Sequence, residues 1–217
     1  MIAQYARTLA AYSDDQWAAY VMQREPLSGK LSRAERLELY RGAVACGREQ
    51  AQLLPRGATV RQLAEEAGVP VKLDETVSDG VFTTFATYSI KDGITIFVDN
   101  ARRTDALIER EGLDDLSGGV KTEDLLLAHE WFHVVEDRTS GLFTQQKHLL
   151  LFRIGRFERR SKVLSLGEVA AMNFAKELTG LPTNPYVYDV LMLYAKNPQR
   201  ARQQFEQIQR VCERLLP

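Results

Sequence analysis

Ala128-His129-Glu130-Trp131-Phe132-His133 is the most informative stretch of this chain of 217 residues. On an α-helix, residues four apart lie on one face about one turn from each other, so both imidazoles can reach a single ion. A glutamate beside the first histidine then lies near the open coordination position, where it can accept a proton from water. The HExxH pattern therefore predicts a zinc site with His129 and His133 as ligands and Glu130 as the catalytic general base.

The residues around this pattern predict one buried helix over 122–137. Apolar residues continue on both sides of the histidines, Thr122 is a candidate N-cap, and acids follow it in the first turn. The alternative is a helix whose histidines only pack or face solvent. Only three histidines occur in the chain, at positions 129, 133 and 148, and two of them fall in this register, which favours the metal site.

A catalytic zinc usually has three protein ligands, so a third ligand is expected elsewhere in the chain. No histidine follows His133 at the metzincin spacing, which leaves a carboxylate from a second helix. The segment 165–178 has helical periodicity, and Glu168 lies one turn into it among small and apolar residues. Burying a carboxylate there is costly unless it meets a cation, so Glu168 is the predicted third ligand. The alternative is a first-turn acid favoured by the helix dipole.

The stretch 128–133, the stretch 168–178 (EVAAMNFAKEL) and the following Leu181-Pro182 together resemble the ImmA/IrrE-type, gluzincin-like zinc metallopeptidase domain. The segments 59–71 and 94–100 are similar to an early helix and a strand of that family. The resemblance covers about residues 35 to 185, and the two motif helices carry nearly all of it. It implies that His129, His133 and Glu168 bind the metal and that Glu130 is the general base. It also implies cleavage of a protein substrate, such as a transcriptional repressor.

One departure from the family pattern is the long segment 138–164 between the two motif helices. It is either a substrate-facing lid or a solvated connection. The segment is basic, with Lys147, Arg153, Arg156, Arg159, Arg160 and Lys162.

The expected fold class is α+β, a mainly helical zincin-like domain with a small sheet of about three strands beside the HExxH helix. We expect one domain over 1–217, with N-terminal helices in 1–54, a catalytic core in 55–185 and C-terminal helices in 186–217. Lys91-Asp92-Gly93 predicts a turn between the last two strands, and an exposed edge strand of this sheet can hold an extended peptide. The expected helices are 14–24, 32–54, 60–67, 186–196 and 199–216, and the expected strands are 71–73, 80–90 and 93–99.

Composition narrows the class of protein. With 45% hydrophobic residues the chain can bury a substantial core, and a net charge of −1 offers no general electrostatic case for nucleic-acid binding. Cys46 and Cys212 match no metal or redox spacing and are expected to be reduced. The first ten residues do not form a leader, and no apolar stretch is long enough to span a bilayer, so we expect a cytoplasmic protein without membrane contact.

Several assignments stay open at this stage. Tyr186, Tyr188 and His148 are candidates for the oxyanion donor by residue type alone. Asn173 and Asp137 are candidates for orienting the ligand histidines. Zn²⁺ is the expected cofactor, although two histidines and a carboxylate also accept Mn²⁺, Fe²⁺ or Co²⁺.

Two other classes of function compete with the peptidase. One is a metal- or stress-responsive regulatory protein with a metallopeptidase-like fold and little turnover. The other is an interaction module of mobile-element origin whose histidines are structural. A helix-turn-helix at 60–71 is disfavoured, because the chain becomes extended where a recognition helix should follow.

Overall fold

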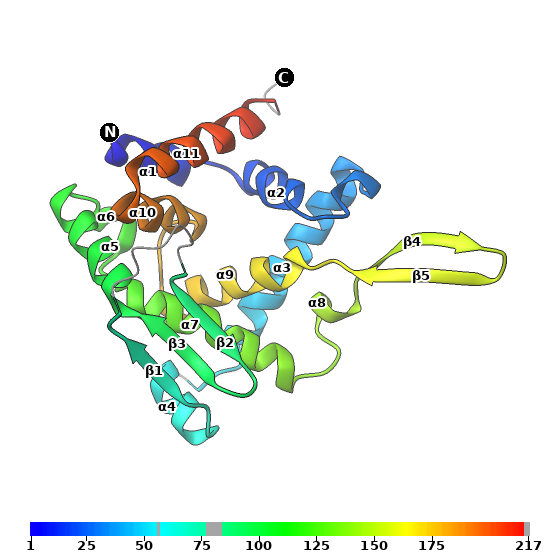
Figure 1. The fold of residues 1–217 in the computed structure, drawn as a ribbon, viewed down its shortest axis with the longest axis horizontal. Coiled ribbons are helices and arrows are strands. Elements are labelled where there is room, and N and C mark those ends of the chain that lie inside the picture. The colour runs from blue at the N-terminus through cyan, green and yellow to red at the C-terminus, as the bar shows by residue number, and fades with distance from the viewer. Residues whose placement is uncertain (56, 77–83, 215–217) are drawn as a thin grey trace.

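The computed structural model describes residues 1–55, 57–76 and 84–214 and shows a mainly helical α+β fold with a small mixed sheet (Figure 1). The elements before the HExxH helix are α1 (Ile2–Ala10), α2 (Asp14–Gln23), the 3₁₀ turn η1 (Ser28–Lys30), α3 (Arg33–Gln52), α4 (Val60–Glu66), β1 (Val71–Asp74), β2 (Ala86–Ser89), β3 (Gly93–Phe97), α5 (Val98–Arg110) and α6 (Asp114–Ser117). The remaining elements are α7 (Thr122–Arg138), α8 (Phe143–Gln146), β4 (His148–Ile154), β5 (Phe157–Lys162), α9 (Ser165–Thr179), α10 (Tyr186–Lys196) and α11 (Pro198–Glu213).

The three-stranded sheet has the order β1-β3-β2, with β1 parallel and β2 antiparallel to the central strand. It packs against α7, and Ile94 and Ile96 of β3 are fully buried (Figure 1). Gly93 begins β3 with a φ of 77°, and a Cβ built on it would lie 2.2 Å from the Pro70 carbonyl oxygen. Only glycine tolerates both conditions, so this position fixes how closely β3 approaches the chain before β1.

Helix α9 packs against both α3 and α7. Gly47 of α3 lets the two backbones meet, because a Cβ there would lie only 2.1 Å from the Ala170 carbonyl oxygen. At the contact between α9 and α7, the centroids of the buried Phe132 and Phe174 rings lie 5.6 Å apart. These contacts bring the first turn of α9 next to the histidines of α7.

The basic segment between α7 and α9 contains a two-stranded antiparallel hairpin that projects from the body of the protein (Figure 1). The sequence analysis predicted no strands here. Strand β4 begins with an apolar run from Leu149 to Phe152, β5 carries most of its charges from Glu158 to Arg160, and Gly155 supplies the positive φ of the turn.

Most expected elements are confirmed within one to three residues, including the β2–β3 hairpin and both motif helices. The expected strand over 80–90 begins inside 77–83, which lies outside the described residues. Two expectations are wrong. Thr122 does not cap α7; Lys121 is the N-cap, and the Thr122 amide and hydroxyl both donate to Asp105 Oδ1, at 2.9 and 2.6 Å. The strand expected over 93–99 ends at Phe97, because Asp99 is instead a first-turn acid of α5.

Cys46 and Cys212 are free thiols buried in α3 and α11, as expected. Among the described residues, no helix combines the length and the apolar character that crossing a bilayer requires.

Candidate metal centre

The two histidines of the HExxH pattern lie side by side on α7, with ring centroids 5.2 Å apart. Both face Glu168, which α9 contributes one turn from its start. His129 Nε2 lies 3.3 Å from Glu168 Oε2, and His133 Nε2 lies 3.6 Å from Glu168 Oε1. The structure therefore brings together the three predicted ligands, which come from segments 35 residues apart in the chain.

The spacing of these atoms fits one zinc ion. One ligand atom from each residue lies within 4.8 Å of the others. Ligands about 2.0–2.1 Å from a tetrahedral ion are roughly 3.3–3.4 Å apart. The separations of 3.3 and 3.6 Å between the histidines and the carboxylate are close to this value, and each histidine approaches a different oxygen of Glu168. The donor set of two imidazoles and one carboxylate is also the set that catalytic zinc sites use.

The charges of the three groups are coupled. The pKa of Glu168 is held at about 2, mainly by His129, so the carboxylate is ionised at neutral pH and available as a ligand. Burial is the largest single effect on the pKa of His129 and lowers it, but the hydrogen bond and charge of Glu168, together with the charges of Glu130 and Asp189, outweigh it and the net direction is upward. The sequence predicted that Glu168 is buried, but its side chain is 63% exposed. It forms an exposed wall of the site, whereas the two histidines are mostly covered.

Glu130 lies beside the ligands with only 8% of its surface exposed. Burial raises the pKa of its carboxyl group above the ordinary value, while the neighbouring histidines oppose the shift. A general base is most effective when its pKa approaches the working pH, so this environment suits proton transfer.

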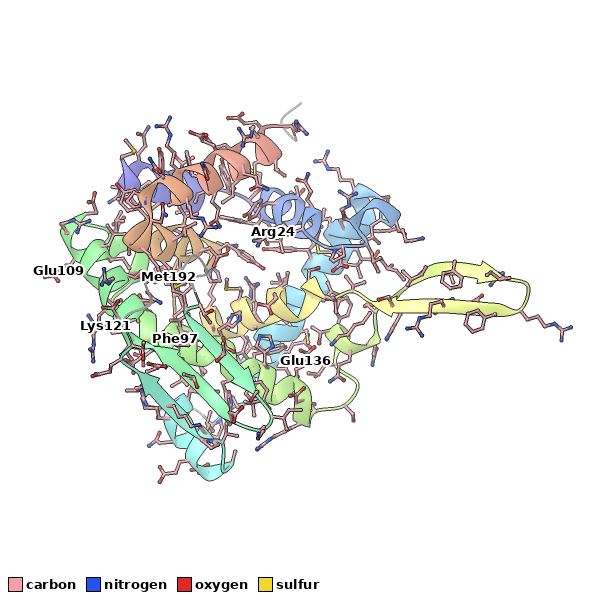
Figure 2. All side chains as sticks on the ribbon, viewed as in Figure 1. Arg24, Phe97, Glu109, Lys121, Glu136 and Met192 are labelled. Carbon is pink, nitrogen blue, oxygen red and sulfur yellow. The ribbon has the colours of Figure 1, made fainter. Side chains whose placement is uncertain are left out.

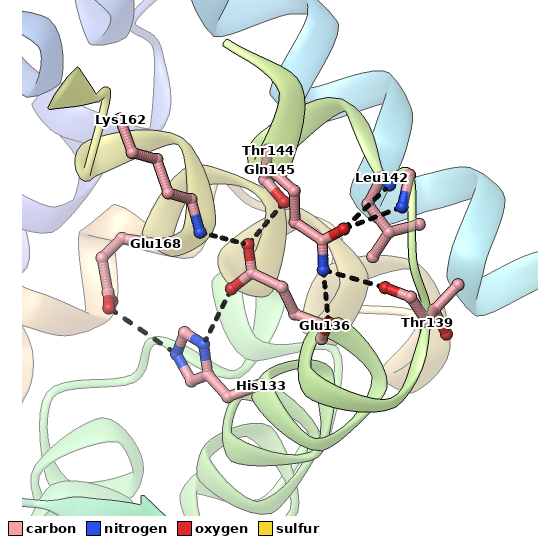
Figure 3. Close-up of polar contacts among 9 residues, drawn as sticks. His133, Glu136, Thr139, Leu142, Thr144, Gln145, Lys162 and Glu168 are labelled. Carbon is pink, nitrogen blue, oxygen red and sulfur yellow. Dashed lines mark hydrogen bonds and ion pairs between the residues drawn. The ribbon is translucent and has the colours of Figure 1, made fainter. Parts of the chain in front are cut away.

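Glu136 also belongs to the site, and the sequence analysis did not identify it (Figure 3). Its Oε2 lies 3.9 Å from His133 Nδ1, the ring nitrogen that faces away from Glu168. Its Oε1 accepts a hydrogen bond from Thr144 Oγ1 at 2.5 Å and lies 3.2 Å from Lys162 Nζ. These contacts hold the pKa of Glu136 at about 2, with His133 as the largest cause. Glu136 lies three residues after His133, on the same face of the helix, and this spacing could have identified it from the sequence.

The residues expected to orient the histidines lie elsewhere. Asn173 donates to the Val169 carbonyl oxygen of its own helix at 2.9 Å. Asp137 lies beside Tyr88, where it adds to the effect of burial in raising the pKa of that phenol. A carboxylate behind a ligating imidazole fixes its tautomer and orientation, and here Glu136 is placed for that role.

A cleft of about 1000 Å³ opens over these residues, and His129, Glu130, His133 and Glu168 all line it. Residues 84–88, which include most of β2, form one wall of the cleft. Among the described residues, β2 pairs only with β3, so no described strand pairs with its other edge. Arg24, just after α2, and Met192, on α10, line the cleft from other elements (Figure 2).

The three candidate oxyanion donors differ in their positions. Tyr186 lines the cleft, and its buried hydroxyl has no hydrogen-bond partner among the described residues. Tyr188 also lines the cleft, but its hydroxyl lies 3.5 Å from the Val120 carbonyl oxygen. His148 begins β4, and its Nδ1 lies 3.1 Å from the Gln146 carbonyl oxygen.

No protein-family model, curated protein or solved structure matches this chain.

Proposed function

We propose that this protein is a zinc-dependent peptidase that hydrolyses a peptide bond in a cytoplasmic protein substrate, such as a transcriptional repressor. The observation that carries the proposal is the convergence of His129, His133 and Glu168 beside the buried Glu130 in an open cleft. A site that served only packing would not need a wide cleft with a carboxylate next to three converging ligand groups.

When bound, zinc supplies Lewis acidity that polarises the scissile carbonyl group and acidifies the attacking water. Glu130 accepts the proton of that water at a carboxylate oxygen and delivers it to the departing amine. Glu136 holds the ring of His133 through its Nδ1 side. The edge of β2 that no described strand covers can pair with an extended peptide by backbone hydrogen bonds, so that the carbonyl group of the peptide would lie over Glu130 and the histidines.

Metal content tests the first half of this proposal. Untagged protein, purified without chelator and analysed by plasma mass spectrometry, should contain about one equivalent of zinc, because three protein ligands converge on one point. His133→Ala and Glu168→Ala should each reduce that content. His148→Ala is the matched control, since this third histidine lies on β4 and should leave the content unchanged. A wild-type protein that holds no metal, even after dialysis against zinc, overturns the proposal.

Glu130→Gln tests the catalytic half, because it keeps the shape of the side chain and removes its basicity. The variant should bind zinc like the wild type and lose hydrolysis of fluorescein-labelled, unfolded casein by about 10²–10⁴-fold, the range typical of general bases. Equal hydrolysis by the two proteins would exclude this role for Glu130. If neither zinc-loaded protein cleaves casein or a panel of unfolded repressors, the metal-responsive regulator replaces the peptidase.

A further inference from the structure

The β4–β5 hairpin is the largest feature that the proposed peptidase mechanism does not use. Its base is tied to the body, because Lys30 Nζ donates to the Leu151 carbonyl oxygen at 2.8 Å and Lys162 contacts Glu136 at 3.2 Å. Beyond this base the two strands extend away from the other described elements, with side chains on both faces (Figures 1 and 2).

The strand register separates the hairpin into two unlike faces. Phe152 pairs with Arg159, and Ile154 pairs with Phe157, so these four side chains lie on one face. The rings of Phe152 and Phe157 lie 6.2 Å apart, while their exposed fractions are 47% and 60% and that of Ile154 is 71%. We call Phe152, Ile154 and Phe157 with Arg159 the apolar face of the hairpin.

The opposite face is held by charges within the hairpin itself. Glu158 contacts both Arg153, across the strands, and Arg160, two residues along the same strand. These pairs stabilise a two-stranded ribbon, which is marginal by itself in water. They do nothing for the apolar face, where three large side chains remain in contact with solvent. Clustered apolar side chains on a projecting element are typical of binding surfaces.

The charge of the hairpin defines the partner further. Residues 147–162 contain six basic residues and one acidic residue, whereas the rest of the chain has 22 basic and 28 acidic residues. Within the hairpin, Arg153, Arg160 and Lys162 are in ion pairs, which leaves Arg156 at the turn and Arg159 on the apolar face without a carboxylate partner in the described part of the chain. Lys147, just before β4, also has no such partner there and lies over the Phe143 ring. A complementary partner is therefore both acidic and apolar.

This combination favours a protein segment over a nucleic acid. Two uncompensated arginines can contact few phosphates, and phosphate contacts supply most of the affinity for nucleic acid. Isoleucine and phenylalanine side chains need apolar partners, which a peptide with alternating acidic and apolar residues provides on one face.

The hairpin is also continuous with the cleft. Strand β5 ends at Lys162, Leu164 and Ser165 line the cleft, and Glu168 follows within one helical turn. A seven-residue strand is about 23 Å long, so a segment held along the hairpin needs roughly seven extended residues to reach the base of the hairpin, beside the cleft.

We propose that the apolar face of this hairpin docks an acidic, apolar segment of the protein substrate outside the cleaved bond. The inference rests on the proposed peptidase function, which supplies the reason for a substrate to bind beside the cleft. Apolar contacts with Phe152, Ile154 and Phe157 would be joined by ion pairs with Arg156 and Arg159. Substrates that contain such a segment would be held near the cleft, while short peptides without it would not.

Direct binding measurements test this proposal without any need for turnover. The probe is a fluorescein-labelled 15-residue peptide that alternates Asp or Glu with Leu or Phe, measured by fluorescence anisotropy in the Glu130→Gln background. Two further peptides serve as comparison, one with serine at every apolar position and one with lysine at every acidic position. Both should bind at least tenfold more weakly than the acidic, apolar peptide.

Two double variants disrupt the two properties of the surface separately. Phe152→Ser with Phe157→Ser removes the apolar contacts, and Arg156→Glu with Arg159→Glu reverses the free charges; each should weaken binding of the acidic, apolar peptide at least tenfold. Leu53→Ser with Ile90→Ser is the matched control, because these exposed apolar side chains lie outside the hairpin, and it should bind like the parent.

Unchanged binding in both hairpin variants overturns the docking surface, whatever the peptidase assays show. The docking surface for a protein segment is also overturned if a 20-base-pair DNA duplex or phosphatidylglycerol vesicles bind through the hairpin more tightly than the acidic, apolar peptide does in the same assay. Conversely, hairpin-dependent peptide binding by a protein that holds no zinc would overturn the peptidase and leave the docking surface intact. The two failures are therefore distinguishable.

Discussion

Glu136→Gln tests the part of the candidate centre that only the structure revealed. The substitution keeps the size of the side chain, and its amide oxygen can still accept a hydrogen bond from Thr144 or Lys162. It removes the negative charge that faces His133 Nδ1. The ring of His133 should then be less strongly oriented and a weaker zinc ligand.

The expected size of this effect follows from the geometry. Carboxylates behind metal-ligating histidines typically contribute 10–100-fold in metal affinity, or about 1.4–2.7 kcal/mol. His133 Nδ1 and Glu136 Oε2 are 3.9 Å apart, which is longer than a hydrogen bond. We therefore expect the lower end of the range, with zinc bound about tenfold more weakly than by the wild type.

Competition with a chromogenic zinc chelator at pH 7 measures this affinity. Glu158→Gln is the matched control, because Glu158 also contacts cationic side chains but lies on β5 and faces no histidine. Circular dichroism of the metal-free proteins verifies that each variant remains folded at the assay temperature. A folded Glu136→Gln variant with wild-type zinc affinity would refute the orienting role of this carboxylate.

Three further predictions concern stability, pH and metal removal. Gly47→Ala places a Cβ at 2.1 Å from the Ala170 carbonyl oxygen, so α3 and α9 must separate, and thermal unfolding should show a loss of about 2–3 kcal/mol. Gly29→Ala, where nothing lies within 4 Å of the new Cβ, is its control, and an equal loss in both variants would contradict the packing argument. The pKa of Glu136 falls from its ordinary value of 4.5 to about 2 in the folded protein, so its contribution to the stability of the metal-free protein is present above pH 4.5 and is lost as the pH falls toward 2. Chemical denaturation across this range should show a shallower loss for Glu136→Gln than for the wild type; identical slopes would argue against the shift. Removal of zinc by chelator should abolish hydrolysis of casein and readdition should restore it, since the ligands stand on packed helices; irreversible loss would indicate that the fold depends on the metal.

Local patterns predicted the parts of the fold that depend on neighbours in the chain. The sequence predicted a helix from residue 32, and the structure shows reciprocal capping bonds between Ser32 and Glu35 at the start of α3. Lys91-Asp92-Gly93 predicted the turn of the β2–β3 hairpin, where Ser89 accepts from the Asp92 amide. Such features need only a few residues in a defined conformation, so sequence alone is sufficient to identify them. The role of Thr122 at the start of α7 could not be identified in this way, because its partner Asp105 lies on another helix.

The sequence by itself determined the chemistry available to this protein: a helix with His129, His133 and Glu130 in the register of a zinc site, and a second helix with Glu168 one turn from its start. Tertiary structure decided which groups meet. The close contact of α9 with α3 at Gly47 places Glu168 within 3.6 Å of both histidines, and the fold of the intervening segment carries Thr144 and Lys162 to Glu136. It also decided that Phe152, Ile154 and Phe157 project into solvent. Helical spacing is set by hydrogen bonds over four residues, whereas distances between helices and the exposure of a strand depend on how distant segments pack.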